Sequence, residues 1–539
     1  MKDFNKKGIL IFLLLALGST LFSQTGPARD SIQINSIKAS VESNGALFRS
    51  NFSVPATTAD IKSISTIKSA GLWLGGRDAQ GKLHLSAQMS NENGKTDFYP
   101  GYLYENGVPY PEFNFIAHAT KAQVNAHIAN PQTPSPAIYG WPGSGNPYFF
   151  DHHGFDLPFS LQGVAGFYDK DFNGQYNPPA GDYPGLGVRG CPLSVKFFPD
   201  ETLWFSFHDV GAHTQSGGEP MKMNVSANVF GINCPEGSPV DRAVYVHYKL
   251  TNRNTEVLDS CYLGAFIDFE IGNGGDDFIG CDSLRRIVYA YNGDDTDEGG
   301  FEKTPPVMAV DLLRGPLNEL GEEVTQWHFV PVDNTPLNSP QAYYNLLAGR
   351  RPNGTPFPNK GLMYTGDPLN PAKWSEKSAN NTPGERKAVA SFGPFTLLPG
   401  AINELILGYF WVRKDPNGNV DDNLSLIAAT DKHVQDLYDN CFSLFNGVCP
   451  GNVATNTPAS NLPITIYPNP FTDQVHIEST ALSLKTIVLY DVFGRQIRQV
   501  SANGGSFADL QTGDLPPGFY WAQVRTQDGQ TGAFKLVKE

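Results

Sequence analysis

The residues best suited to chemistry lie in one Asp/Asn/Gly-rich segment, residues 168–185, which reads YDKDFNGQYNPPAGDYPG. Asp169, Asp171 and Asn173 place oxygen-bearing side chains on alternate residues, and Gly174 follows them. This spacing is typical of the first half of a calcium-binding loop, because the alternation points three oxygen ligands at one centre and glycine permits the sharp turn around it. We therefore expect this segment to hold a calcium ion.

The second half of the segment departs from the EF-hand pattern. Ala180 stands where that pattern has its glutamate ligand. We expect Asp182 or the side chain of Asn177 to complete the calcium shell instead. The alternative is a turn whose Asp and Asn side chains cap their own backbone and bind no metal.

A second group of acidic residues follows between residues 268 and 298. Its members that we take as candidate metal ligands are Asp268, Glu270, Asp276, Asp277 and Asp282, and Asn292, Asp294, Asp295, Asp297 and Glu298 extend the group. Carboxylates this dense repel one another unless they are solvated or share a cation. The group predicts either a further calcium site or a solvated acidic surface. Two of the carboxylates could also be a glycosidase acid and base, but their spacing in sequence does not fix their distance in space.

Motifs of common enzyme classes are missing from the sequence, which contains no HExxH and no GxSxG. Gly185, Gly187 and Gly190 have the spacing of a dinucleotide-binding turn but lie in a Pro-rich stretch, not between a strand and a helix. Aromatic residues gather between Tyr99 and Phe149. They could form a sugar-stacking platform, although a place in the core is the more common outcome for such residues.

The charge distribution argues against a nucleic-acid partner. The chain has 39 basic and 54 acidic residues, which gives a formal net charge of −15. Residues 462–539 hold six basic and seven acidic residues, so nearly all of the acidity lies in the preceding part. Binding to phosphate backbones requires clustered Lys and Arg. Acidic loops suit hard cations instead.

Short apolar runs separated by turn residues dominate the chain. We therefore predict a mainly β fold, with a multi-domain β-sandwich body and few short helices. One helix is expected at Lys121–Ile128 with Thr120 as its cap, and a longer amphipathic helix at 421–441 with Asp421 or Asp422 as its cap.

These patterns divide the chain into five segments. We expect a signal peptide at 1–23, an N-terminal β-rich region at 24–160, a β-rich body with acidic calcium-type loops and one amphipathic helix at 161–450, a linker at 451–461 and a C-terminal domain at 462–539. The apolar run of the first segment is shorter than the ~20 residues that a bilayer requires. We expect no transmembrane segment in the mature chain.

Export to an oxidising compartment would make the six cysteines candidates for disulfides. We expect at least one bond, among Cys234, Cys261 and Cys281 or between Cys441 and Cys449. Six cysteines allow fifteen pairings, so the connectivity stays open at this point.

The last segment combines dense short strands with an ordered set of motifs, and about seven strands in fewer than eighty residues predict a small β-sandwich. The motif residues are, in order, Pro468, Asn469 and Pro470, then Tyr490, Asp491, Gly494 and Arg495, then Gly518 and Tyr520, and finally Lys535 to Lys538. In these motifs the segment resembles the type A sorting domain of type IX secretion substrates of the Bacteroidota. The resemblance implies an Ig-like β-sandwich that the outer-membrane translocon recognises.

The resemblance also implies a route and its partners. These are the Sec export machinery, the type IX translocon and its sortase, and they would deliver the chain through the periplasm to the outer-membrane surface or the medium. The body resembles large, uncharacterised secreted proteins that carry such a domain, in stretches such as GLWLGG (71–76) and IDFEIGNGGDDFIGCD (267–282). This second resemblance implies no activity.

These features predict a calcium-stabilised, non-enzymatic adhesin, scaffold or glycan-binding protein at the cell surface. Its partner would be a glycan or another surface ligand. The alternative is a secreted hydrolase, a glycosidase or a peptidase, whose active-site residues come from loops far apart in the sequence. Carboxylates that converge on one centre favour the first interpretation, and an isolated pair about 5–10 Å apart in a deep cleft favours the second.

Overall fold

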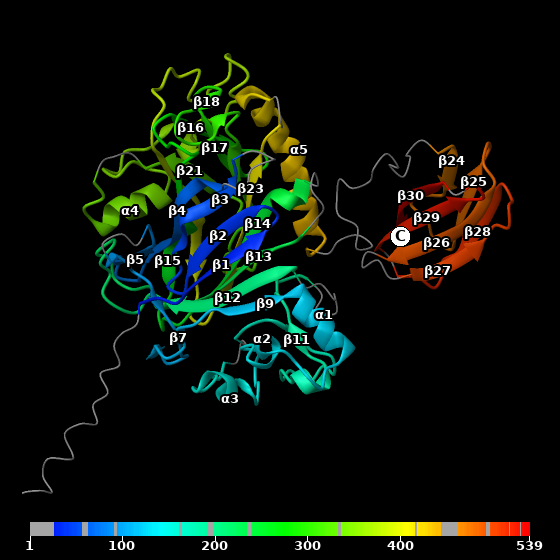
Figure 1. Ribbon diagram of the computed structural model, residues 1–539, viewed down its shortest axis with the longest axis horizontal. Coiled ribbons are helices and arrows are strands. Elements are labelled where there is room, and N and C mark those ends of the chain that lie inside the picture. The colour runs from blue at the N-terminus through cyan, green and yellow to red at the C-terminus, as the bar shows by residue number, and fades with distance from the viewer. Residues whose placement is uncertain are drawn as a thin grey trace, which may run out of the picture.

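The computed structural model, shown in Figure 1, describes most of the chain. The described residues are 26–56, 63–90, 94–160, 164–191, 199–233, 239–332, 336–414, 418–442, 462–491, 496–516, 518–528 and 530–538. The expected signal peptide (1–23) and the expected linker (451–461) lie outside them. In the described parts the chain is mainly β, as the sequence predicts.

Most of the strands between Arg29 and Val412 form two large antiparallel sheets. Sheet A has eight strands, in the order β1 (Arg29–Ile34), β2 (Ile37–Glu42), β3 (Leu47–Pro55), β4 (Ser63–Arg77), β15 (Leu258–Phe269), β22 (Arg386–Leu397) and β21 (Trp327–Pro331), with β5 (Leu83–Ala87) also paired to β4. Sheet B has nine, in the order β16 (Asp277–Asp282), β17 (Ile287–Asn292), β20 (Val307–Arg314), β23 (Ile402–Val412), β14 (Ala243–Asn252), β13 (Met223–Gly231), β12 (Glu201–His208) and β6 (Tyr99–Pro100), with β9 (Ala117–Thr120) also paired to β12.

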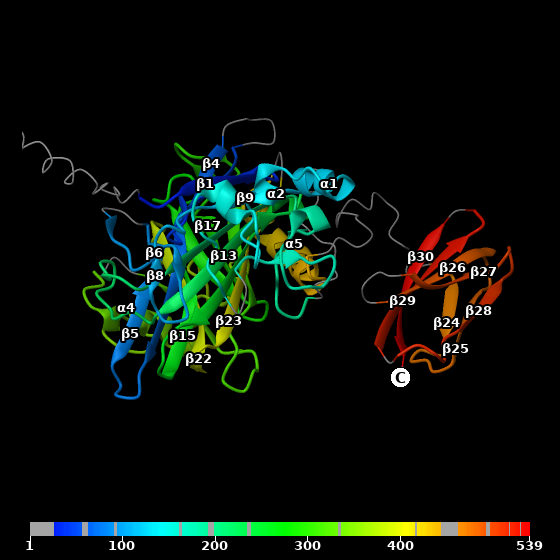
Figure 2. The ribbon, with the colours of Figure 1, turned by 90° about the horizontal axis from the view of Figure 1, so that it is seen from below.

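The sheets pack face to face, as the view in Figure 2 shows, and one main hydrophobic cluster draws on both of them. Alternation along each strand decides which side chains enter this core, since successive residues face opposite sides. In β14, Val244, Val246 and Tyr248 lie in the core between the sheets, whereas Ala243 and Tyr245 belong to a second cluster on the outer face of sheet B. The outer face of sheet B is therefore free to carry other elements and polar side chains.

Each sheet combines strands from both sides of residue 160. Strand β4 pairs with β15 in sheet A, and β9 pairs with β12 in sheet B. The boundary expected at residue 160 therefore does not divide the two sheets into separate units, because strands from both sides of it pair in each sheet. Hydrophobic periodicity marks where strands lie, but it does not reveal which distant strand each one joins.

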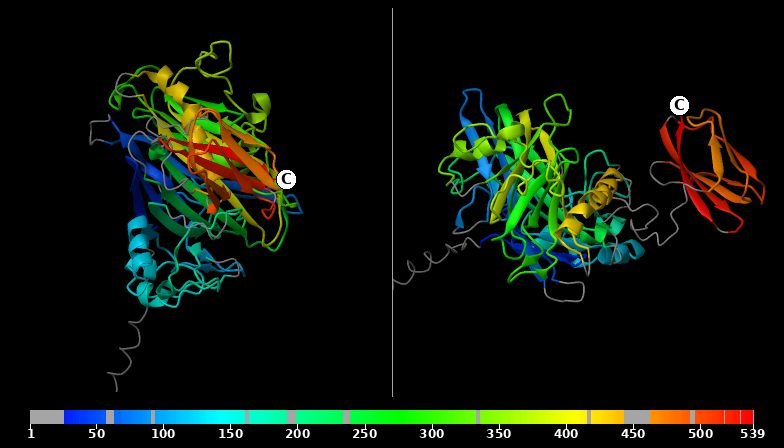
Figure 3. Two further views of the ribbon diagram at one scale, coloured as in Figure 1. Left: turned by 90° about the vertical axis from the view of Figure 1, so that its right-hand side faces the viewer. Right: turned by 90° about the horizontal axis from the view of Figure 1, so that it is seen from above.

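Helix α5 (Val420–Asp439) lies along the outer face of sheet B (Figures 1 and 3) and fills the second cluster with Leu424, Val434 and other apolar residues. Its position agrees with the sequence pattern, but its cap does not. The side chain of Asn419 accepts a hydrogen bond from the backbone N–H of Asp422, at 2.7 Å, and serves as the cap in place of Asp421 or Asp422. Residue 420 is already helical, so the cap falls before it.

Helix α1 (Lys121–Ala129) begins where the sequence predicts, with Thr120 and Gln123 forming a capping box. The remaining short elements are α2 (Pro136–Tyr139), α3 (Phe149–His153), α4 (Pro340–Leu347), the 3-10 turns at Pro178–Ala180, Pro239–Arg242 and Pro358–Gly361, and the two-residue strand pairs β7 (Tyr102–Leu103) with β8 (Pro109–Tyr110), β10 (Phe167–Tyr168) with β11 (Tyr183–Pro184), and β18 (Thr296–Asp297) with β19 (Glu302–Lys303). Several of the aromatic residues between 99 and 149 belong to the core: Tyr102, Trp141 and Phe149 are buried in one cluster with Trp204, and Tyr104 packs against it, partly buried.

A disulfide joins Cys191 to Cys441, with the Cα atoms 5.5 Å apart. The bond ties the segment after β11 to the C-terminal end of α5. The expectation of at least one disulfide is confirmed, but the expected pairings were wrong. Cys261 and Cys281 are free and buried and lie on different sheets, and Cys441 pairs across 250 residues of sequence. Cys234 and Cys449 lie outside the described residues.

The C-terminal domain is a sandwich of a three-stranded and a four-stranded antiparallel sheet over its own core. The first sheet has the order β24 (Ile464–Tyr467), β25 (Gln474–Ser479) and β28 (Phe507–Gln511), and the second has the order β27 (Gln496–Ser501), β26 (Leu484–Asp491), β29 (Gly518–Thr526) and β30 (Thr531–Lys538). This matches the small sandwich expected from the spacing of its strands. Among the described residues of the whole chain, no helix is long and apolar enough to cross a membrane.

Candidate functional site

The loop between β10 and β11 brings its two acidic ends together through strand pairing. Tyr168 pairs with Tyr183 in the antiparallel register, and their rings stack with centroids 4.6 Å apart. Asp169 follows the first tyrosine and Asp182 precedes the second, so the pairing places the two carboxylates at the neck of the loop. Local sequence therefore positions the predicted ligands without help from distant segments.

Three carboxylates of this loop converge. Asp169, Asp171 and Asp182 each offer an oxygen within 4.8 Å of the others. Backbone N–H groups support the arrangement: Asn173 and Gly174 donate to Asp169 at 3.2 and 2.7 Å. Gly174 has a φ of +74°, which explains the preference for glycine where the loop turns. Asp169 and Asp182 at the two ends of the loop and Asp171 within it therefore direct carboxylate oxygens at one point.

The amide side chains of the loop have different surroundings. Asn173 donates from Nδ2 to Asp171 Oδ2 at 2.9 Å and accepts at Oδ1 from the N–H of Gln175 at 2.6 Å. Asn177 donates its backbone N–H to Asp182 at 2.8 Å, while its side-chain Oδ1 is buried and has no hydrogen-bond partner among the described residues. Oxygen atoms of both residues could join a cation shell.

Electrostatics favour a cation at this centre. Asp182 is fully buried, and burial raises the pKa of its carboxyl. The charges of Asp169 and Asp171 raise that pKa further, whereas hydrogen bonds from the N–H groups of Lys170 and Asn177 oppose the rise. A cation would relieve the repulsion among the three carboxylates.

A cavity of about 310 Å³ adjoins the loop, and Asp169 and Gly174 form part of its wall. The loop side also contributes Ser144, Phe167 and Leu186. The opposite wall is the outer face of sheet B. Asp169 therefore belongs both to the cluster of carboxylates and to the lining of the cavity.

The sheet wall consists of side chains from three neighbouring strands. Successive residues of a strand face opposite sides of the sheet, so the side chains that line the cavity come from alternate residues. Trp204, Asn228 and His247 are successive partners across β12, β13 and β14. Ser226 and Lys249, two residues along, form the next row, and all five side chains line the cavity. These residues are not among the predicted site residues. The polar residues at alternate positions in MNVSANVFG and AVYVHYKL indicate that one face of these strands is polar.

A buried ionic network fixes one member of this wall. His247 Nε2 lies 3.1 Å from Glu404, which also lies 2.9 Å from Arg314. Burial alone would raise the pKa of Glu404, but hydrogen bonds from His247, Arg314 and the backbone N–H of Arg189 hold it at about 2. Glu404 is therefore ionised and orients the imidazole of His247.

The acidic residues of 268–298 do not converge in the same way. Among the described residues, the group formed by Asp169, Asp171 and Asp182 is the one set of three or more whose ligand atoms lie within 4.8 Å. Asp268 lies on sheet A and Asp282 at the end of β16 in sheet B, because the chain changes sheets between β15 and β16. Asp268 and Asp282 are therefore close in sequence but lie on different sheets.

Each of these acidic residues has its own local role. Glu270 pairs with Lys68 at 3.6 Å, and Asp282 pairs with Arg285 at 2.5 Å. Asp277 accepts from the N–H of Ile271 at 2.9 Å. Asp276 and Asp277 each keep one buried oxygen that no donor in the described part of the chain reaches, and burial raises the pKa of both.

Asp268 is buried near Lys387, 4.0 Å away. Burial raises its pKa to about 7 against the opposing charges of Lys387 and Lys68.

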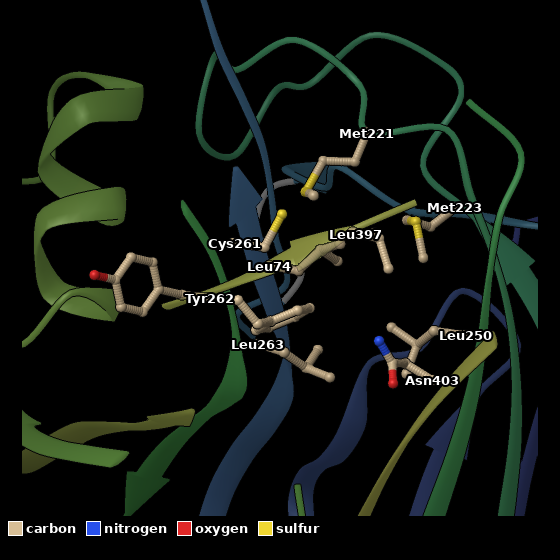
Figure 4. Close-up of a pocket in the computed structure, with 10 residues that line it drawn as sticks. Leu74, Met221, Met223, Leu250, Cys261, Tyr262, Leu263, Leu397 and Asn403 are labelled. Carbon is tan, nitrogen blue, oxygen red and sulfur yellow. The ribbon is translucent and has the colours of Figure 1, made fainter. Parts of the chain in front are cut away.

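Figure 4 shows a contrasting cavity of about 10 Å³ between the two sheets. The sulfur atoms of Met221 and Cys261 face one another there, and the ring of Tyr262 turns away toward α4. Burial raises the pKa of the Cys261 thiol, which keeps it protonated. This cavity is a packing defect in the apolar core and offers no ligand site.

In the C-terminal domain the predicted motif residues hold the chain's last strand in place. Asn469, between Pro468 and Pro470, accepts from the N–H of Val537 at 2.8 Å. Lys538 contacts the carbonyl of Thr472, with its Nζ 5.8 Å from the ring centroid of Phe471.

The other motif residues mark the ends of neighbouring strands. Tyr520 is buried and donates to the carbonyl of Pro516 at 2.8 Å. Gly518 begins β29 with a φ of +152°, and Asp491, at the end of β26, is the register partner of Tyr520. Lys535, in β30, is the register partner of Trp521 in β29. Gly494 and Arg495 lie outside the described residues.

Residues 465–539 match the family model of the secretion system C-terminal sorting domain. The chain is a type IX secretion substrate. The sorting domain implies a partner in the secretion machinery and a location at the cell surface or outside the cell. The predicted sorting domain is confirmed, and the match does not extend to the body.

Comparison of the whole chain yields little more. No curated protein matches the sequence. Among solved structures, it is similar to a polysaccharide lyase at 10% identity and a TM-score of 0.19, over 66% of this chain and 37% of the lyase, so it spans well under half of that protein. It is also similar to the BSP domain of a biofilm-associated protein at 9% identity and a TM-score of 0.16, over 90% of this chain and 85% of that one. Likenesses at this level carry no argument about function.

Proposed function

We propose that the body is a calcium-stabilised, non-enzymatic glycan-binding protein, displayed as an adhesin or scaffold by its sorting domain. One observation carries the proposal. Asp169 belongs to the converging carboxylates of the loop and also lines the cavity beside it. A cation that fixes the loop would thereby fix one wall of the ligand cavity.

Calcium is the cation that suits this loop. Its ligands would be Asp169, Asp171 and Asp182, with Asn173 and Asn177 as further oxygen donors. The set contains oxygen ligands alone, which hard cations prefer, and its irregular spacing suits the flexible coordination of calcium better than the strict octahedron of magnesium. Extracellular calcium modules bind with dissociation constants of about 10⁻⁴–10⁻³ M.

The surroundings of the carboxylates favour binding over hydrolysis. In the cavity beside the loop, the one carboxylate in the wall is Asp169, which is engaged with its own loop. A second groove, near residues 331–387, has two, but Glu376 pairs with Arg386 at 2.7 Å and Glu385 with Lys387 at 3.0 Å. Neither arrangement is the isolated acid and base that a glycosidase needs.

The calcium part of the proposal is tested with terbium, which emits when a nearby tyrosine is excited. Tyr168 and Tyr183 flank the loop and would sensitise a bound ion. Calcium should displace terbium with a millimolar or tighter constant, and the exposed substitution Asp171→Asn should weaken binding at least tenfold because it removes a charged ligand. Asp151→Asn, an exposed change in α3, is the matched control. Equal emission from Asp171→Asn and the wild type would contradict the calcium site.

The binding part is tested with the mature chain on immobilised glycans, with millimolar calcium or with EDTA. We expect retention on a subset of glycans that falls when calcium is removed, without release of reducing sugar. Hydrolysis of any glycan, or of a peptide substrate panel, would favour the hydrolase instead.

A further inference from the structure

The cavity between sheet B and the loop has unmet hydrogen-bonding capacity on its sheet wall. Asn228 is 5% exposed, and its side-chain Oδ1 is buried with no hydrogen-bond partner among the described residues. His247 is 1% exposed, and its Nδ1 is likewise buried and without a partner there. These two residues are direct cross-strand partners, so both atoms belong to one small area of the wall. A buried polar atom is costly unless something pairs with it.

Both atoms are acceptors. The carboxylate of Glu404 accepts from Nε2 of His247, and in the tautomer with its one ring hydrogen on Nε2 the buried Nδ1 offers a lone pair directed elsewhere. Asn228 offers a carbonyl oxygen. The matching ligand must therefore donate at least two hydrogen bonds from neighbouring positions. Adjacent hydroxyl groups do this.

The rest of the lining is apolar or weakly polar. Phe167, Val164 and Leu186 come from the loop side, and Trp204 from the sheet. An aromatic or aliphatic surface opposite a row of acceptors suits a molecule with one C–H face and a rim of hydroxyls. The volume of 310 Å³ is at the lower end of the range of about 300–1,000 Å³ for ligand pockets, which is enough for one sugar ring.

The charges of the wall do not select an ion. Lys249 is the cation of the lining and Asp169 its anion. Lys249 is also the cross-strand partner of the buried carboxylate Glu404. Because the lining carries one charge of each sign, its net charge is close to zero and an anionic ligand gains little from Lys249.

We propose that this cavity is a subsite for a single uncharged sugar residue, whose neighbouring hydroxyls donate to Asn228 Oδ1 and His247 Nδ1. The inference rests on the proposed glycan-binding function and names its ligand class and its residues. A terminal residue of a neutral glycan fits the site, with the rest of the glycan leaving past the loop of Asp169.

The test uses the full mature chain and ligand-observed NMR with methyl glycosides of glucose, galactose, mannose and N-acetylglucosamine. Methyl glucuronide is the charged comparison. A sugar of about a dozen heavy atoms should bind with a dissociation constant on the order of 1 mM. We expect binding of at least one neutral glycoside and weaker binding of the glucuronide.

Asn228→Leu tests the residue assignment. Leucine keeps the approximate shape but removes the acceptor, so affinity should fall at least tenfold while the thermal midpoint stays the same or rises. Thr202→Val is the matched control. Thr202 is also buried, and its hydroxyl oxygen has no partner among the residues that the structure describes. It lies two residues from Trp204 in β12 and is outside the cavity lining, so sugar affinity should not change. Ser226→Leu, which fills the cavity, should abolish binding and keeps the test valid if Asn228→Leu fails to fold.

The outcomes separate this inference from the proposed function. Glycan retention that survives both Asn228→Leu and Ser226→Leu would overturn the subsite and leave the function standing. Stronger binding of the glucuronide than of every neutral glycoside would overturn the ligand class. Sugar binding without any response to calcium or terbium would support the subsite and overturn the calcium role. No binding of any glycan by the wild-type chain would overturn both proposals.

Discussion

Two carboxyl groups are buried against each other where α5 lies on sheet B. Asp311 of β20 is 1% exposed and Asp431 of α5 is 4% exposed. No donor among the described residues reaches either oxygen of Asp311 or Oδ1 of Asp431. The pair is therefore satisfied only when one carboxyl keeps its proton and donates it to the other. Replacing Asp431 by asparagine supplies a permanent donor and removes one ionisable group.

The size of the effect follows from the pKa. Burial raises the pKa of Asp431 from an ordinary 3.8 to about 6, although the hydrogen bond with Asp311 and the charge of Arg285 oppose the rise. The folded chain then binds this proton more tightly than the unfolded chain, so stability is lost as pH rises from about 4 to above 6. A shift of about 2 units corresponds to about 3 kcal/mol in the free energy of unfolding.

Asp431→Asn should remove this loss. The variant is expected to match the wild type within about 1 kcal/mol at pH 4, where Asp431 carries its proton, and to exceed it by about 2–3 kcal/mol at pH 8. Urea unfolding followed by tryptophan fluorescence measures the difference. Six of the seven tryptophans precede residue 462, so the signal reports mainly on the body.

The control is Asp439→Asn, an exposed change in the last turn of the same helix. It should change the pH dependence of unfolding far less, because the charge of Asp439 is only a minor contribution to the raised pKa of Asp311. If Asp431→Asn leaves the difference between pH 4 and pH 8 unchanged, the buried carboxyl is not held protonated and the reasoning fails. A variant that is destabilised equally at both pH values would show that Asp431 contributes through packing alone.

Three further outcomes follow from the fold. Cys441→Ser should lower the free energy of unfolding by about 2–5 kcal/mol under oxidising conditions, because the bond to Cys191 closes a long loop; an equal midpoint for the reduced and oxidised wild type in calorimetry would contradict this. Deleting residues 531–539 removes β30 and should leave the protein in the periplasm; fractionation that finds a normal surface or medium yield would refute it. Asn419→Ala should cost α5 about 1 kcal/mol through its lost cap, whereas Asp421→Ala should cost less; urea unfolding that reverses this order would show that the cap is misassigned.

The sequence by itself determined the features that depend on neighbouring residues. The capping box of Thr120 and Gln123, the helical period of α5 and the convergence of the Asp169 and Asp171 carboxylates all follow from rules that act over a few positions. The sorting domain belongs with them, because its motifs follow one another in order within one short sandwich.

Tertiary structure decided everything that requires distant segments to meet. The pairing of β4 with β15, the disulfide from Cys191 to Cys441 and the separation of Asp268 from Asp282 depend on which strands join which sheet. The cavity that we propose as a sugar subsite is of the same kind. Alternation put polar residues on one face of β13 and β14, but only the loop packed opposite them turned that face into a cavity, since a strand carries no information about what will cover it.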